Sequence, residues 1–378
     1  MNNNLSEYIK LRHLLHKSAE VSGNEKKTNE ILNEYLSKTS PDMQIPEIGG
    51  YGLAAVYQGE RAGKTILIRA DIDALPIPET IAPPYASDTP GVAHKCGHDG
   101  HSTILYSIAD YLKENKPLSG RVVLLFQPAE ETGEGAKRVI EDEKFNNLIP
   151  DFVFGFHNLP GFNLHEIIMK EGVFAAASRG YICKLFGKTS HAAEPENGIS
   201  PAMALSEIIA DTYKIYESDK FSELTLLTII HARLGEVAFG TSPGYAEYMA
   251  TLRAYLNDDI EKLNSILTTV VSEKCKKYNL KFEESLTEVF PATVNNPELD
   301  KSVMEICKEL DFARSYIEKP FKWSEDFGHF CEKFPAYYFG IGAGKNRSAL
   351  HNTDYDFPDE IIPTGRKMLI GLINKMTS

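Results

Sequence analysis

Residues 121–131 read Arg-Val-Val-Leu-Leu-Phe-Gln-Pro-Ala-Glu-Glu, an apolar run that ends at two adjacent carboxylates, Glu130 and Glu131. The apolar part does not alternate with polar residues, which is typical of a strand covered on both faces of a sheet. Three other runs share this form and lead into polar side chains: 65–70 into Asp71 and Asp73, 151–156 into His157, and 336–341 into a loop that reaches His351. Helical patterns separate several of these runs, which predicts an α/β fold with helices on both faces of the sheet.

Residues 94–101 read His-Lys-Cys-Gly-His-Asp-Gly-His and precede an apolar helical pattern over 102–113. Thiol, imidazole and carboxylate groups are typical ligands of transition metals. Gly97 permits the tight turn that Cys96 and His98 need to reach one ion or a pair of ions. Each group alone has an ordinary explanation, such as a buried thiol, a capping histidine or a solvated glutamate pair at a helix start. Because such residues follow several strands, and functional groups gather at the carboxyl ends of strands, their combination indicates metal-assisted hydrolysis.

The composition excludes several classes of protein. A net charge of −13 argues against a nucleic-acid partner, and no run approaches the ~18 consecutive apolar residues of a membrane span. The start of the chain lacks a basic-then-apolar signal segment, and the five cysteines are scattered, so we expect a cytoplasmic protein without disulfides. The 378 residues exceed the usual size of a single core, which predicts two domains.

The pattern of elements changes between residues 178 and 289. There, strand-like and helical stretches follow in a new order: strand 180–186, helix 200–216, strands 224–231 and 245–255, helix 258–278 and strand 281–290. This order predicts a smaller α+β insert at 178–289, and residues 291–297 are typical of a linker that returns to the first domain. The first domain is then discontinuous and comprises residues 1–177 and 290–378.

Four motifs closely resemble the M20 metallopeptidase family, in particular its amidohydrolase branch of hippurate hydrolases, N-acyl-amino-acid amidohydrolases, auxin-conjugate hydrolases and N-acetyldiaminopimelate deacetylases. They are Arg-Ala-Asp-Ile-Asp-Ala-Leu-Pro at 69–76, the stretch 94–101, Phe-Gln-Pro-Ala-Glu-Glu at 126–131 and Leu-His-Asn at 350–352. The resemblance covers essentially the whole chain, including residues 11–17 and 324–327. It implies a mixed-sheet catalytic domain with an inserted lid that also forms the interface of a homodimer.

The resemblance also implies roles for individual residues. The expected ligands of a two-metal centre are Cys96, His98, Glu131, His157 and His351, with Cys96 bridging as a thiolate. Asp71 ends the strand where other branches carry a histidine ligand, and His98 is expected to substitute for it. Asp73 is expected to orient a ligand or the base. Glu130 resembles the general base that activates the attacking water. Ligand softness favours zinc, nickel or cobalt, whereas the carboxylate also admits manganese, so zinc or manganese is expected.

Two residues of the insert match lid residues of the family. His191 matches a histidine that helps to hold the substrate or the oxyanion, and its alternative is a surface turn. Arg253 is expected to contact a substrate carboxylate or a neighbouring acid. Many relatives carry an Asn-Val-Ile-Pro segment in the lid, whereas residues 239–243 read Phe-Gly-Thr-Ser-Pro here and contain no asparagine. His231 is a candidate for the missing polar contact.

The sequence therefore predicts a two-metal amidohydrolase that cleaves an acetyl or benzoyl group from an N-acyl amino acid. The alternative within the same chemistry is a dipeptidase or carboxypeptidase that cleaves a short peptide. From another class, Cys96 with His98 or His101 could form a thiol-nucleophile hydrolase, which a chelator would not inhibit. A binding protein without metal is the non-enzymatic alternative, and the intact Glu130 with five filled ligand positions counts against it.

Overall fold

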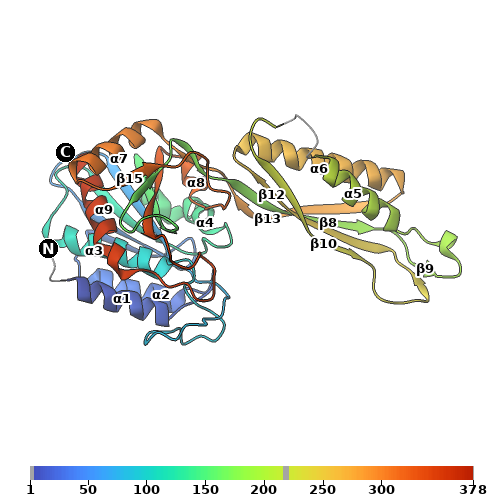
Figure 1. Ribbon diagram of the computed structural model, residues 1–378, viewed down its shortest axis with the longest axis horizontal. Coiled ribbons are helices and arrows are strands. Elements are labelled where there is room, and N and C mark those ends of the chain that lie inside the picture. Colours follow the sequence, from blue (N-terminus) through green and yellow to red (C-terminus); the bar gives the residue numbers. More distant parts are fainter. Residues whose placement is uncertain (1–3, 216–220, 378) are drawn as a thin grey trace. The chain divides into compact units, whose positions relative to one another are not determined.

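The computed structural model describes residues 4–215 and 221–377, and the chain divides into two compact units (Figure 1). The first unit comprises Met1–Phe174, Thr293–Pro320 and Glu325–Ser378. The second unit comprises Ala175–Ala292, which contains the insert expected at 178–289, together with the short segment Phe321–Ser324. No pattern in the sequence predicts that this last segment belongs to the second unit.

The first unit is built on an eight-stranded sheet with the order β1-β2-β4-β3-β5-β16-β6-β15. Its strands are β1 (Met43–Ile48), β2 (Gly52–Gln58), β3 (Thr65–Asp71), β4 (Arg121–Gln127), β5 (Phe152–Pro160), β6 (Ile167–Met169), β15 (Arg314–Tyr316) and β16 (Ala336–Gly344). The four central strands β4, β3, β5 and β16 are parallel, whereas β1, β2 and β6 pair antiparallel with their inner neighbours. The short β7 (Gly172–Ala175) and β14 (Thr293–Asn295) form a separate pair. The predicted α/β class and the mixed sheet are confirmed.

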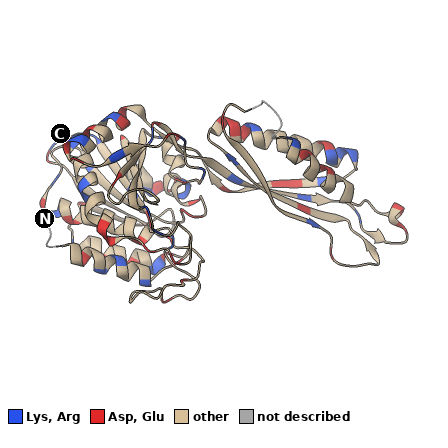
Figure 2. Cartoon of the chain, viewed as in Figure 1, with Lys and Arg blue, Asp and Glu red and all other residues tan. Residues whose placement is uncertain are grey.

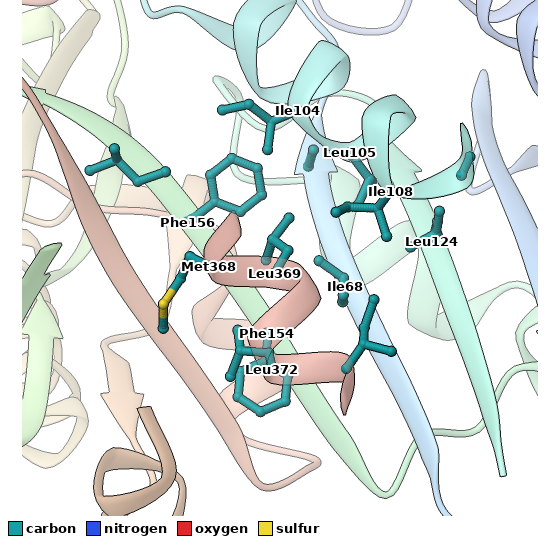
Figure 3. Packing of buried hydrophobic residues seen from close by; sticks show 14 of the residues in the cluster. Ile68, Ile104, Leu105, Ile108, Leu124, Phe154, Phe156, Met368, Leu369 and Leu372 are labelled. Carbon is teal, nitrogen blue, oxygen red and sulfur yellow. The ribbon is translucent and has the colours of Figure 1, made fainter. Parts of the chain in front are cut away.

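Both faces of the sheet are buried, as its continuous apolar strands predicted. One face packs against α1 (Leu5–Lys17), α2 (Lys26–Ser37), α3 (His98–Glu114), α7 (Pro297–Glu309) and α9 (Ile362–Met376). In Figure 3, the side chains of α3 and α9 gather over Ile68, Leu124 and Phe154 of the sheet. Side chains that alternate to the other face, such as Tyr338, meet Phe327 at a ring-centroid distance of 4.9 Å. On this side lie α4 (Gly135–Glu141) and α8 (Gly328–Cys331). Elsewhere in the unit, short 3-10 helices span Glu143–Asn147 and Asp359–Ile361.

Helix α3 begins four residues before its predicted start at 102, so His98 and His101 lie in its first turn instead of in a preceding loop. Gly97 caps the helix in the left-handed conformation, with φ +96°. The first turn is polar but buried, so it does not display the apolar periodicity that marks the rest of the helix. This burial of polar groups at a helix start already distinguishes the region from an ordinary cap.

The second unit carries an antiparallel sheet with the order β10-β12-β8-β13, formed by β8 (Ala177–Phe186), β10 (Thr225–Leu234), β12 (Tyr245–Ala254) and β13 (Lys281–Phe290). Its helices α5 (Ala202–Lys214) and α6 (Asn257–Lys277) pack against the sheet, and β12 alternates buried and half-buried residues accordingly. Tyr216, the predicted end of the first of these helices, lies outside the described residues. Figure 2 shows acidic and basic residues intermixed along both helices, where Lys274 pairs with Glu207 and Asp211.

The strands β9 (Ser190–His191) and β11 (Thr241–Ser242) form a small ribbon in the second unit, and a 3-10 turn follows at Pro195–Asn197. Across residues 4–215 and 221–377, every helix is too short or insufficiently apolar to cross a bilayer.

Candidate metal centre

The parallel strands deliver the predicted residues to one edge of the sheet. Strand β3 ends at Asp71, which pairs in register with Gln127 at the end of β4, just before the two glutamates. His157 lies within β5 and is paired with Gly340 of β16, so the prediction that it follows the strand is wrong by a few residues. The carboxyl ends of parallel strands meet at one edge, and this is why these distant residues converge.

Cys96, His98 and His157 form the first group of potential ligands, with one donor atom from each lying within 4.8 Å of the others. The Cys96 Sγ lies 3.3 Å from the His157 Nε2. Gly97 makes this approach possible, because a Cβ atom there would lie 2.3 Å from the Asn158 Oδ1. The glycine is therefore required both for its positive φ and for the space beside Asn158.

Cys96, Glu131 and His351 form a second group with the same 4.8 Å limit. The His351 Nε2 lies 3.5 Å from the Glu131 Oε1. The loop that carries His351 is held there because its backbone N–H donates to the Lys95 carbonyl at 2.8 Å. Both groups share the Cys96 sulfur, which is the arrangement that a bridging thiolate requires.

Asp73 orients two of the predicted ligands. The His98 Nδ1 lies 2.9 Å from the Asp73 carbonyl oxygen and 3.3 Å from its Oδ1, so this nitrogen is the one that donates to Asp73 and Nε2 is the atom left to bind a cation. The Glu131 N–H donates to the Asp73 Oδ2 at 3.0 Å. The His98 Nε2 and the Glu131 Oε1 are buried and have no hydrogen-bond partner among the described residues. A buried acceptor without a donor is costly, so these atoms fit a bound cation.

The charges of the site favour the same interpretation. Burial raises the pKa of Glu131 to about 8, and burial with nearby carboxylates holds the pKa of the Cys96 thiol well above its usual range. Burial alone lowers the pKa of His98, but Asp71, Asp73 and Glu131 outweigh it and raise that pKa to about 10. The site therefore carries more buried acidic groups than its own side chains neutralise, and a divalent cation reverses these shifts by stabilising the thiolate and carboxylate.

Glu130 is 5% exposed, so the alternative of a solvated glutamate pair at a helix start is wrong. Its carboxylate lies within 4.8 Å of those of Glu325 and Asp326, and its Oε1 faces the Asp326 N–H at 3.4 Å. Burial, followed by the charges of Glu325, Glu131 and Asp326, raises the pKa of Glu130 well above its usual range. A carboxyl group with a raised pKa beside candidate metal ligands is suited to accept and return a proton.

The arginine that organises this cluster has a role that was not predicted from the sequence. Arg69 is fully buried and its guanidinium reaches four groups: Asp71 at 2.8 Å, Gln127 at 2.8 Å, Glu325 at 2.9 Å and Asp326 at 2.7 Å. The one signal in the sequence was an arginine inside an apolar strand, because a buried arginine needs several acceptors. Glu325 and Asp326 belong to a stretch noted only for its resemblance to the family.

His101, a candidate base in the thiol-nucleophile alternative, is engaged on both ring nitrogens. Its Nδ1 lies 2.6 Å from the Asp71 Oδ1, and its Nε2 accepts the Asn158 N–H at 3.1 Å. The imidazole that faces the Cys96 sulfur belongs to His157.

The predicted lid residues lie in the second unit. His191 is exposed on β9, where it pairs with Thr241 and its Nδ1 accepts the Ala193 N–H at 3.1 Å. Arg253 donates through Nη1 to the Lys322 carbonyl and the Ser324 Oγ, both at 2.9 Å, and so secures the segment Phe321–Ser324. The His231 Nε2 lies 3.4 Å from the Glu247 Oε2.

Comparisons with known proteins agree with this geometry. The model of the peptidase family M20/M25/M40 matches residues 67–375. The chain is 31% identical to a hippurate hydrolase of Campylobacter jejuni over 94% of this chain and 93% of the relative. It is also 31% identical to thermostable carboxypeptidase 2 of Saccharolobus solfataricus, over 94% and 92% of the two chains. A solved structure described as a dinuclear metal binding peptidase of the M20 family, the YxeP protein of Bacillus subtilis, superimposes with a TM-score of 0.82 at 24% identity and covers 98% of this chain and 97% of that chain. This chain therefore belongs to the peptidase family M20/M25/M40, and it is a hydrolase that acts on amide bonds.

Proposed function

We propose that this chain is a two-metal amidohydrolase that releases an amino acid from an N-acyl amino acid. The observation that carries the proposal is the pair of three-residue donor groups that share the Cys96 sulfur. Cys96, His98, Glu131, His157 and His351 would hold the two cations between them. Thiolate and imidazole ligands suit zinc, and the carboxylate also admits manganese, with nickel or cobalt as further options.

The side chains around this centre divide the work. When bound, two divalent cations polarise the substrate carbonyl and lower the pKa of the attacking water. Glu130 takes the proton from that water and returns it to the nitrogen of the departing amine, as general base and then general acid. Asp73 orients His98 and Glu131, and Arg69 holds the side chains of Glu325 and Asp326 beside Glu130. Adjacent glutamates thereby separate metal binding from proton transfer.

The second unit supplies the candidates for substrate binding. His191 is proposed to stabilise the developing oxyanion or hold the substrate, because its imidazole is exposed and available. Arg253 is proposed to bind the substrate carboxylate, and its hydrogen bond to Ser324 holds the guanidinium in place. The hippurate hydrolase relative supports an N-benzoyl substrate, whereas the carboxypeptidase relative supports the alternative of a short peptide.

A hydrolysis screen tests the proposal. Protein stripped with a chelator and reloaded with zinc or manganese is offered N-acetyl amino acids, N-benzoyl amino acids, dipeptides and N-blocked peptides. We expect release of free amino acid from the N-acyl substrates at the highest kcat/KM, and loss of activity after chelation. A preference for free dipeptides or N-blocked peptides would favour the peptidase alternative. Activity that survives the chelator would overturn the two-metal proposal.

A homodimer formed through the second unit is also part of the proposal. Strand β10 lies at one edge of its sheet, and it exposes Ile230 at 62%. Edge strands with apolar residues commonly pair with a second chain. Sedimentation analysis of the wild type and of Ile230→Lys tests this, because the charge should shift the protein towards the monomer.

A cytoplasmic location is proposed as well, and it is supported by five free cysteines.

A further inference from the structure

Glu25 lies in the loop between α1 and α2, and the reaction described above makes no use of it. Its side chain is fully buried, and its Oε1 accepts two backbone N–H groups at 2.8 Å, those of Gly23 and Ala129. The Oε2 is buried and has no hydrogen-bond partner among the described residues. Burying a carboxylate that is only half satisfied costs free energy, so the bond to Ala129 must serve a purpose that outweighs this cost.

Ala129 directly precedes the glutamate pair and has φ +52°, in the left-handed region. For a residue with a Cβ, this conformation costs about 1–2 kcal/mol and persists only where the surroundings enforce it. The Ala129 N–H donates to Glu25, and the Ala129 carbonyl accepts the Gly135 N–H at 3.0 Å. The backbone turn that aims Glu130 is therefore fixed on both sides of a strained residue.

The same loop makes a second contact with the glutamate pair. The Ser22 Oγ donates to the Asp73 Oδ2 at 2.7 Å, and this oxygen also accepts the Glu131 N–H at 3.0 Å. Residues 22–25 thus fix the backbone on both sides of Glu130. Glu25 holds Ala129 directly, and Ser22 holds the Glu131 backbone indirectly, through Asp73.

We propose that Glu25 is a positioning residue for amide hydrolysis, which sets the direction of the Glu130 carboxylate by holding Ala129 in its left-handed conformation. This inference rests on the proposed function of Glu130 as the base. Glu25 belongs to none of the candidate donor groups, and its proposed effect passes through the backbone N–H of Ala129. A misplacement of about 1 Å at a catalytic group lowers turnover by up to about 100-fold.

The bond depends on an acceptor at a fixed distance. Glu25→Gln keeps an oxygen at the position of Oε1, so it should retain nearly the wild-type kcat. Glu25→Asp keeps the charge but is one methylene shorter, so the N–H of Ala129 loses its acceptor. Glu25→Ala removes the acceptor altogether. We expect kcat to fall by about 10–100-fold in the Asp and Ala variants, with KM and metal content near the wild-type values.

Glu20→Ala is the matched control. Glu20 also uses a carboxylate to fix α2, since its Oε2 accepts the Thr28 N–H at 2.9 Å and the Thr28 hydroxyl at 3.0 Å. It makes no such bond to the turn before Glu130. We expect Glu20→Ala to lower the thermal stability of the protein but to leave kcat per metal-loaded site unchanged.

Amide hydrogen exchange of the metal-free protein gives a readout that does not depend on activity. In Glu25→Ala, the peptide that contains Ala129 should exchange faster than in the wild type, whereas Glu20→Ala should leave this peptide unchanged. The inference is overturned if Glu25→Ala and Glu25→Asp keep the wild-type kcat, if Glu25→Gln loses as much as they do, or if Glu20→Ala produces the same loss. These results differ from a failure of the proposed function, in which the wild type itself would hydrolyse no amide substrate. If Glu25→Ala does not fold, the comparison of Asp with Gln decides the question.

Discussion

The Cys96 sulfur faces the His157 imidazole at 3.3 Å, although 61 positions separate the two residues in the chain. The His157 Nδ1 is occupied by the backbone carbonyl of Asn158 at 2.8 Å, so the lone pair of Nε2 points towards the sulfur. Burial holds the pKa of His157 well below and that of Cys96 well above their usual ranges. These shifts favour a neutral pair over the thiolate–imidazolium pair that a cysteine nucleophile needs.

Replacement of the thiol tests the shared ligand. We expect Cys96→Ser to lower the bound metal per chain, because a serine hydroxyl is a much weaker ligand than a thiolate for zinc. Elemental analysis after gel filtration measures the metal content. Cys275→Ser, at a buried thiol in the second unit, should retain the full content. An unchanged metal content in Cys96→Ser would remove Cys96 from the ligand set.

The adjacent glutamates should respond differently to the same change. Glu130→Gln should retain metal but lose about 100–10,000-fold in kcat, because an amide cannot accept the proton. Glu131→Gln should instead lose metal, because its carboxylate lies among the donor groups. Initial rates and metal content measured on the same preparations separate the two effects. Normal turnover in Glu130→Gln would show that another group is the base.

The turn at Gly97 should not tolerate a side chain. Gly97→Ala places a Cβ 2.3 Å from the Asn158 Oδ1 at a residue with φ +96°, so we expect a loss of both metal affinity and stability. Gly91→Ala is the matched control, because Gly91 also has a positive φ, +77°, but no atom lies within 4 Å of a Cβ there. The control should cost only the left-handed strain of about 1–2 kcal/mol, as measured by denaturant unfolding. Equal losses in the two variants would contradict the role of close packing at Gly97.

A buried histidine should make the stability of the protein fall at alkaline pH. Burial alone lowers the pKa of His16, but its hydrogen bonds to Asp99 at 2.8 Å and Glu79 at 2.9 Å outweigh this and raise the pKa to about 9. Since the folded pKa exceeds the unfolded value of about 6.5, the stabilisation is complete below pH 6.5 and is lost as the pH rises through 9. The loss is on the order of 3 kcal/mol.

Urea unfolding of the metal-free protein between pH 6 and pH 10 measures this effect. His16→Gln should reduce the alkaline slope without abolishing it, because His98, whose pKa is raised to about 10, also contributes to it in the metal-free protein. His13→Gln, on the same helix, should retain it, because burial and Arg12 lower the pKa of His13. A slope that persists unchanged in His16→Gln would assign the alkaline loss to other groups.

The convergence of the candidate ligands could be predicted from the sequence, because buried parallel strands end at a common edge. The residues that support those ligands were harder to find. Arg69 and Asp326 are 257 positions apart, and their contact follows from the packing of the whole sheet instead of from any local period. The Glu25 side chain accepts a hydrogen bond from the backbone N–H of Ala129. Every residue except proline has this N–H, so the residue type at position 129 does not reveal the contact. The start of α3 was misplaced because buried polar residues occupy its first turn.

The position of β16 beside β5 has a consequence for synthesis. Strand β16 is made some 180 residues after β5, beyond the whole second unit, yet it must dock in the interior of the sheet and brings with it the loop of His351. A nascent chain from which β16 and the following loop have not yet emerged therefore lacks one internal strand and one candidate donor. The proposed metal centre can thus assemble only after the loop that carries His351 has emerged, long after the other candidate donors are in place along the chain.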